Sequence, residues 1–174
     1  MRPSRARGGA VVSVLVGVVG LLATGCAMLG PTSLEVLGGQ RVVLGRVDLA
    51  LLAAASEIVV DVVRVDGGYA TQFYVGHGAW EFALALPPGR YLIPSIRIAS
   101  QRAPLPQEPT RSISVTFDVG DAPAVYIGTL RLTSGLGTRV ETTVIDEYAS
   151  TVPALRRHYA NIPAEVARAL MRPA

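Results

Sequence analysis

The stretch that decides the fold is Ser112–Val119, which reads SISVTFDV. Apolar residues occupy every second position, and serine, threonine or aspartate occupies the positions between them. A period of two with one apolar face predicts a strand that is buried on one side only. The strand-like segments Ala124–Leu132 and Thr138–Asp146 follow, separated by the turn sequences GDAP and TSGLG. We therefore predict two consecutive hairpins in this part of the chain.

A second alternating segment, Trp80–Leu86, is followed by Pro-Pro-Gly and then by the strand-like segment Arg90–Ile98. Proline presets the backbone of a turn and glycine accepts a positive φ, so this sequence predicts a tight turn between two paired strands. Each strand should turn one apolar face toward the core. The predicted inward residues are Trp80, Phe82, Leu84, Tyr91 and Ile93. The chain's only tryptophan would then be part of the core.

The upstream residues contain further strand-like segments. Gln40–Leu49 and Glu57–Val65 are rich in β-branched residues, and Asp66-Gly67-Gly68 predicts a hairpin turn before the next strand. Leu49–Ser56 is compatible with one or two helical turns or with a continued strand. Pro94 predicts an edge strand or a bulge, because proline cannot donate to a ladder.

The pattern changes beyond Asp146. Two segments, VPALRRHYA and IPAEVARALM, each have a proline near a first helical turn, where proline is tolerated. In the second, Ile162, Val166 and Leu170 form a stripe at a spacing of four. We predict a mainly β fold: a single β-sandwich of about eight or nine strands over residues 35–149, with a short helical hairpin over 150–174 packed on it.

The N-terminal residues have the three-part layout of a secretory signal. Arg2, Arg5 and Arg7 precede the apolar run Ala10–Ala23, and small residues lead to Cys26, the only cysteine. The apolar run is shorter than the roughly 20 residues that a membrane-spanning helix needs. An uncleaved membrane helix is an alternative, because the uncharged span is longer than the apolar run.

The residues Leu22–Cys26, LATGC, resemble the lipobox of bacterial lipoproteins. The resemblance implies that the Cys26 thiol receives a diacylglycerol, that the signal peptide (1–25) is removed and that the new amino group is acylated. Residues 26–34 would then be a lipidated tether. The implied location is the cell envelope, lipid-anchored at the periplasmic face of the outer membrane. The alternative is an ordinary signal peptide with an incidental cysteine.

A second resemblance concerns the fold. The segment FALALPPGRYLI resembles prealbumin-like and carboxypeptidase-regulatory-like β-sandwich domains, in which a PPG turn opens a core strand. Small bacterial lipoproteins of unknown function carry similar LPPGRY and VYIGTL segments, which match Leu86–Tyr91 and Val125–Leu130 here. These motifs imply a fold and specify no site.

The charges argue against a nucleic-acid partner. The chain has 16 Lys plus Arg against 13 Asp plus Glu, and three of the arginines precede Cys26, so the mature part carries 13 minus 13, or zero. The C-terminal residues have a local excess of positive charge. We interpret Arg156, Arg157, Arg168 and Arg172 as solvated residues of a hairpin docked on the sandwich, with contact to anionic lipid headgroups as the alternative.

The inventory of reactive groups is small. The two histidines, His77 and His158, lie in no metal or nucleophile motif, so we predict no cofactor and no metal site. Ser150, His158 and Asp146 resemble a triad on paper, but serine and aspartate are also ordinary at a strand-to-helix junction. The proline-rich segment Gln101–Arg111 is interpreted as a connection between sheets, with a ligand for a partner as the alternative.

We therefore expect a non-catalytic, membrane-anchored envelope lipoprotein that acts as a binding or structural module, with an envelope protein as its partner. Tyr74 and His77 are the candidate binding surface. One alternative is a hydrolase or metal-dependent enzyme with a site assembled from loops. The other is a membrane-surface module that uses the basic C-terminal helices.

Overall fold

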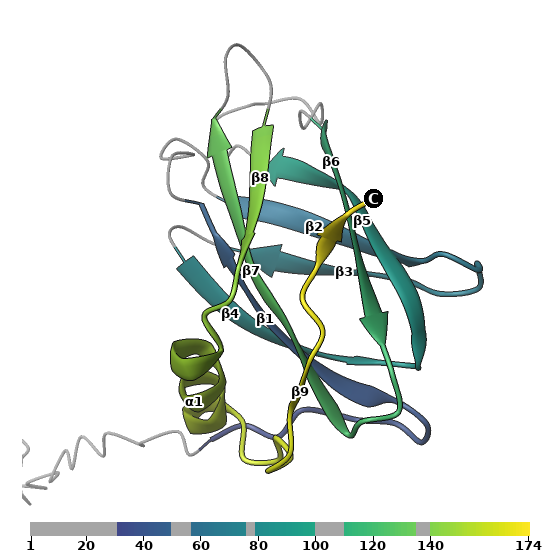
Figure 1. Ribbon diagram of the computed structural model, residues 1–174, viewed down its shortest axis with the longest axis vertical. Helices are drawn as coiled ribbons and strands as arrows, with labels where there is room; N and C mark the ends of the chain where they lie inside the picture. Colours follow the sequence, from purple (N-terminus) through teal and green to yellow (C-terminus); the bar gives the residue numbers. More distant parts are fainter. Residues whose placement is uncertain (1–30, 50–56, 76–78, 100–109, 135–139) are drawn as a thin grey trace, which may run out of the picture.

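The computed structural model describes residues 31–49, 57–75, 79–99, 110–134 and 140–174, which form two β-sheets and one helix (Figure 1). The first sheet has the order β4 (Ala79–Leu86), β1 (Arg41–Asp48), β7 (Ala124–Ser134) and β8 (Val140–Ile145), and β9 (Ala167–Arg168) also pairs with β7. The second sheet has the order β10 (Arg172–Pro173), β6 (Thr110–Val119), β5 (Gly89–Ala99), β2 (Glu57–Arg64) and β3 (Ala70–Val75). The predicted mainly β sandwich is confirmed.

The main core lies between the two sheets and takes side chains from both. The period-two prediction for β6 is confirmed, because its four apolar residues are buried while Ser112, Ser114 and Asp118 are exposed. Tyr91 is fully buried and stacks on Phe117 with ring centroids 5.4 Å apart. Burial raises the pKa of the Tyr91 phenol, and its hydroxyl donates to the Pro87 carbonyl over 2.7 Å.

The connection at Pro87-Pro88 differs from the prediction. β4 pairs with β1 in the first sheet, whereas β5 pairs with β2 and β6 in the second, so these residues carry the chain between sheets and do not close a hairpin. The β6–β7 connection also crosses between sheets. β4 joins the first sheet because it is apolar on both sides and that sheet is covered on both faces. Phe82 faces the main core and Ala83 faces the helix. The hairpins β2–β3 and β7–β8 are confirmed.

The predicted C-terminal helical hairpin is wrong in its second half. The helix α1 (Tyr148–His158) forms, but the residues after it are extended and contain β9 and β10. Backbone N–H groups of Ala169 and Met171 donate to the β7 carbonyls of Tyr126 and Ile127 over 3.0 and 2.8 Å. The segment therefore completes an open strand edge and runs on to pair with β6 in the other sheet, as the yellow ribbon in Figure 1 shows.

The outer face of the first sheet is covered by α1 and the C-terminal segment. Val152 and Leu155 of α1 form a second apolar cluster with Val42, Leu44 and Tyr126 of the sheet. Within the described ranges, no helix combines the length and the apolar character that a membrane crossing requires. Residues 50–56 lie outside the described residues, so the alternatives for Leu49–Ser56 stay open.

Trp80 does not face the core as predicted. Phe82 and Leu86 are buried and Leu84 packs against the core, but 48% of Trp80 is exposed. Trp80 is the second residue of β4, at the margin of the sandwich. Alternation therefore predicts correctly that Phe82, Leu84 and Leu86 face the core. It does not predict how deeply the residue at the end of the strand is buried.

We expect Phe82→Ala to lower the free energy of unfolding by about 3–5 kcal/mol, because it removes a buried aromatic side chain that stacks on Phe73 at 4.4 Å. Trp80→Ala is the matched aromatic control and should have a clearly smaller effect. Urea denaturation of both variants measures this. Equal losses would show that Trp80 packs as a core residue.

Gly45 provides a second test of the core. A Cβ placed on Gly45 would lie 2.9 Å from Cε1 of Phe82 and closer still to Cζ, and that ring is buried. Gly45→Ala should therefore cost about 1–3 kcal/mol through overpacking. Gly38→Ala is the control, since a Cβ there meets nothing within 4 Å. Thermal denaturation with no difference between the two variants would contradict the packing of Phe82 over Gly45.

Candidate functional sites

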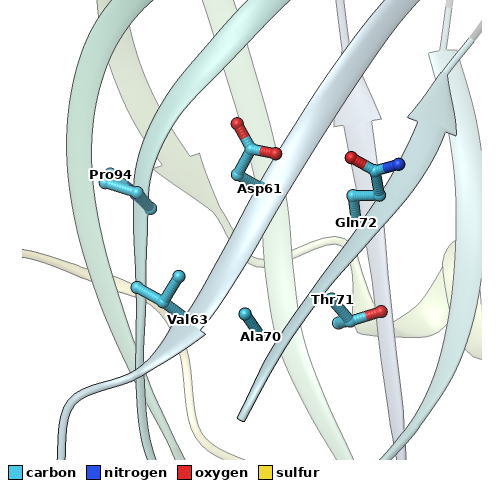
Figure 2. Close-up of a pocket in the computed structure, with 6 residues that line it drawn as sticks. All are labelled: Asp61, Val63, Ala70, Thr71, Gln72 and Pro94. Carbon is cyan, nitrogen blue, oxygen red and sulfur yellow. The ribbon is translucent and has the colours of Figure 1, made fainter. Parts of the chain in front are cut away.

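A hollow of about 450 Å³ lies on the outer face of the second sheet (Figure 2). Its lining comes from the neighbouring strands β2, β3 and β5. The lining residues are Asp61, Val63, Ala70, Thr71, Gln72 and Pro94. We call this surface the sheet-face hollow.

The hollow lies where the ladder between β2 and β5 is irregular. The pairs Val60↔Ile96 and Val63↔Leu92 leave two residues of β2 opposite three of β5, with Pro94 in the middle of the three. On the other side of β5 the register also shifts at Pro94, opposite Ser114, which has a positive φ of 50°. The predicted bulge at Pro94 is therefore confirmed, and the edge-strand alternative is wrong because β5 is central. Bulges bend strands, which accounts for a hollow here.

A polar network crosses three strands at the rim of the hollow. The Arg97 guanidinium donates to Asp61 Oδ1 through Nη2 over 2.9 Å and to Oδ2 through Nε over 3.3 Å. The same Nη2 donates to Gln72 Oε1 over 2.7 Å, and Gln72 Nε2 donates to the Tyr74 hydroxyl over 3.5 Å. A forked guanidinium–carboxylate contact fixes the orientation of both groups. The network is only partly buried, so it presents oriented donors and acceptors to solvent.

Tyr74 is the predicted site residue that this network includes, and 59% of it is exposed. His77 lies outside the described residues. Sequence reasoning missed Asp61, Gln72 and Arg97. The available signal was a single acidic residue inside the apolar strand EIVVDVVR, but its partners become visible only once the strand register is known.

A second concave surface, the helix-end groove, lies beside the C-terminal end of α1. It has a volume of about 430 Å³. It is lined by Thr32, Trp80, Glu81, Leu155, His158 and Tyr159. The groove thus joins the start of the described chain, the first residues of β4 and the last turn of the helix.

The triad considered from the sequence is not assembled. Ser150 and His158 are eight residues apart on one helix, which places them about 12 Å apart along its axis. The Ser150 hydroxyl donates to the Glu147 carbonyl over 3.0 Å, and Asp146 accepts from Tyr148 N and pairs with Arg168. Asp146 and Ser150 form hydrogen bonds at the start of the helix, and His158 lies at its end. No group of three or more His, Cys, Asp or Glu side chains suited to a metal occurs in the part of the chain that the structure describes.

The four candidate membrane-contact arginines lie on three different elements. Arg168 pairs with Asp146 at 3.2 Å and lies 4.1 Å from the centre of the Tyr148 ring. Arg172 belongs to β10, at the edge of the second sheet. Arg156 and Arg157 remain together in the last turn of α1, where both are exposed. Cys26 lies outside the described residues.

No protein-family model, curated protein or solved structure matches the chain.

Proposed function

We propose that the protein is a lipid-anchored binding module of the cell envelope that presents the sheet-face hollow to a partner. The observation that carries the proposal is the difference between the two sheets. α1 and the C-terminal segment cover the outer face of the first sheet with apolar contacts. The outer face of the second sheet instead displays exposed polar and aromatic residues beside the hollow, among them Gln72 and Tyr74.

The shape of the hollow supports a partner larger than a small molecule. Its lining residues come from adjacent strands of one sheet, so it is a depression in a surface, whereas small-molecule sites bury about 70–90% of the ligand. The network supplies a carboxylate, a guanidinium, an amide and a phenol in a row. This chemistry suits a polar stretch of a protein surface, with hydrogen bonds that fix its register.

The anchor part of the proposal is tested by mass spectrometry of the purified mature protein. We expect a chain that begins at Cys26 and carries diacylglycerol and an N-acyl group, because two or more acyl chains are needed for stable membrane binding. Cys26→Ala should leave the precursor uncut. An intact Met1, or an unmodified amino group at Cys26, would overturn the anchor.

The partner is tested by placing a photoreactive amino acid at position 74 in cells. The control position is 37, because Leu37 and Tyr74 are almost equally exposed, at 60% and 59%. We expect a crosslinked protein adduct from position 74 alone. Equal adducts from both positions, or none from 74, would contradict a partner at the sheet-face hollow.

The network itself is tested in the same assay with Asp61→Asn, which keeps the shape of the side chain and removes its charge. The adduct at position 74 should decrease, because Arg97, which donates to Gln72, loses the carboxylate that orients it. The melting temperature should change little, since partly exposed ion pairs contribute about 0–1 kcal/mol. An unchanged adduct would show that the network does not contact the partner.

A further inference from the structure

The residues that lead into the sandwich are attached to the C-terminal end of α1. Thr32 N donates to the His158 carbonyl over 2.8 Å, and the Thr32 carbonyl accepts from Ala160 N over 3.1 Å. The Asn161 side chain bonds both backbone groups of Leu34, donating to its carbonyl over 2.7 Å and accepting from its N–H over 2.8 Å. These four hydrogen bonds, which we call the tether latch, fix where the N-terminal segment meets the domain.

The latch limits how far the helix end can lie from an anchor at Cys26. Six residue steps separate Cys26 from Thr32, and a fully extended chain covers at most about 22 Å over that length. This limit holds for any conformation of the intervening residues. A lipid on Cys26 would therefore keep the C-terminal end of α1 closer to the bilayer surface than the diameter of the domain itself, which is about 30 Å for a small domain.

The arginines at this end of α1 lack carboxylate partners, unlike most of the others. Six arginines in the described residues form ion pairs with Asp or Glu: Arg46, Arg64, Arg90, Arg97, Arg131 and Arg168. Arg156 instead donates to the neutral carbonyls of Pro163 and Ala164 over 2.9 and 2.7 Å. Arg157 has no hydrogen-bond or ion-pair partner within the described ranges. Both therefore keep an uncompensated charge at the surface.

The surroundings of these arginines also suit a membrane interface. The helix-end groove next to them includes Trp80, which is half exposed, and tryptophan is enriched at membrane–water interfaces. His158, in the same turn of the helix, is also exposed. The acidic residues nearby include Glu81, which lines the groove, Glu165, which follows Ala164, and Glu35, which follows the latch residue Leu34. None of these carboxylates forms an ion pair with Arg156 or Arg157 within the described residues.

The geometry points to a membrane-facing end of the domain: the last turn of α1, with Arg156, Arg157 and the helix-end groove, rests on an anionic bilayer. This inference rests on the proposed anchor at Cys26. A purely structural role accounts for part of the arrangement, because cations near a helix C-terminus stabilise the helix dipole and Arg156 holds two carbonyls. For Arg157 the helix dipole is the whole of that structural role, because Arg157 bonds nothing within the described residues, so its guanidinium stays available to a lipid headgroup beside the tether latch.

The test uses the full lipidated protein in phosphatidylcholine vesicles with and without phosphatidylglycerol. Cysteines are introduced singly as Ala160→Cys, beside the latch, and Ser112→Cys, on the second sheet; both positions are exposed. A nitroxide label at each reports its distance from a paramagnetic ion chelated to lipid headgroups. We expect strong relaxation enhancement at 160 and weak enhancement at 112 on anionic vesicles. The difference should fall in about 1 M salt, where the Debye length is about 3 Å.

Charge variants complete the test. Arg157→Gln should weaken the contact about fivefold, because an arginine near an anionic surface contributes about 1 kcal/mol. Arg90→Gln is the control, since Arg90 lies on β5 of the second sheet and pairs with Asp118. An unchanged contact in Arg157→Gln, or an equal loss in both variants, would overturn the inference.

Failure of the anchor and failure of the contact give different results. A thioether-linked Cys26 cannot react with the label, so labelling of the wild-type chain would show a free thiol and overturn the proposed anchor. An unlabelled wild type with no difference between 160 and 112 would overturn the membrane contact alone. A label at 160 that is buried only in native membranes, and not on protein-free vesicles, would assign this surface to a protein and also overturn the contact.

Discussion

The first sheet is apolar on both faces, and most of the structure depends on covering it. Along β1, Val43 and Val47 face the main core, while Val42 and Leu44 face α1. β7 is likewise buried on both sides, as strands of fully covered sheets are. In the second sheet, β3 and β6 alternate between exposed and buried positions, so only one side of these strands needs a cover. Among the described residues, the outer face of the second sheet therefore has no apolar cover like the one that α1 gives to the first sheet.

The cover is held in place by a polar junction at the start of α1. Glu147 N donates to the buried Tyr126 hydroxyl over 2.9 Å, and the buried Thr129 hydroxyl donates to Glu147 Oε2 over 2.8 Å. Arg46 lies 3.5 Å from the same carboxylate oxygen. With its start fixed to the sheet, α1 places its other end beside the tether latch. The helix thus covers the sheet and sets where the N-terminal segment is attached.

The sequence predicted the local elements well and their assembly poorly. The alternation of Ser112–Val119 predicted a strand, because a helix has a period of about 3.6 residues and does not place every second residue on one face. Turn chemistry did not distinguish a hairpin from a crossing between sheets at Pro87-Pro88, since both need the same reversal. The spacing of Ile162, Val166 and Leu170 suits one face of a helix, but it is also even, so it fits one side of an extended chain equally well. The network of Asp61, Gln72 and Arg97 depends on the register of three strands, which no local pattern contains.

The pairing of the charges explains how unpaired arginines can lie together at one end of residues 26–174, although these residues carry no net charge. Residues 26–174 sum to zero charge, but a bilayer senses only charges within about 8 Å at physiological ionic strength. The paired arginines and their carboxylates lie on other parts of the sandwich and cancel locally. Arg156 and Arg157 bond neutral groups or none, so their charge is not cancelled where it is presented. The net charge of these residues therefore says little about the charge presented at the C-terminal end of α1, which depends on which arginines lack a carboxylate partner there.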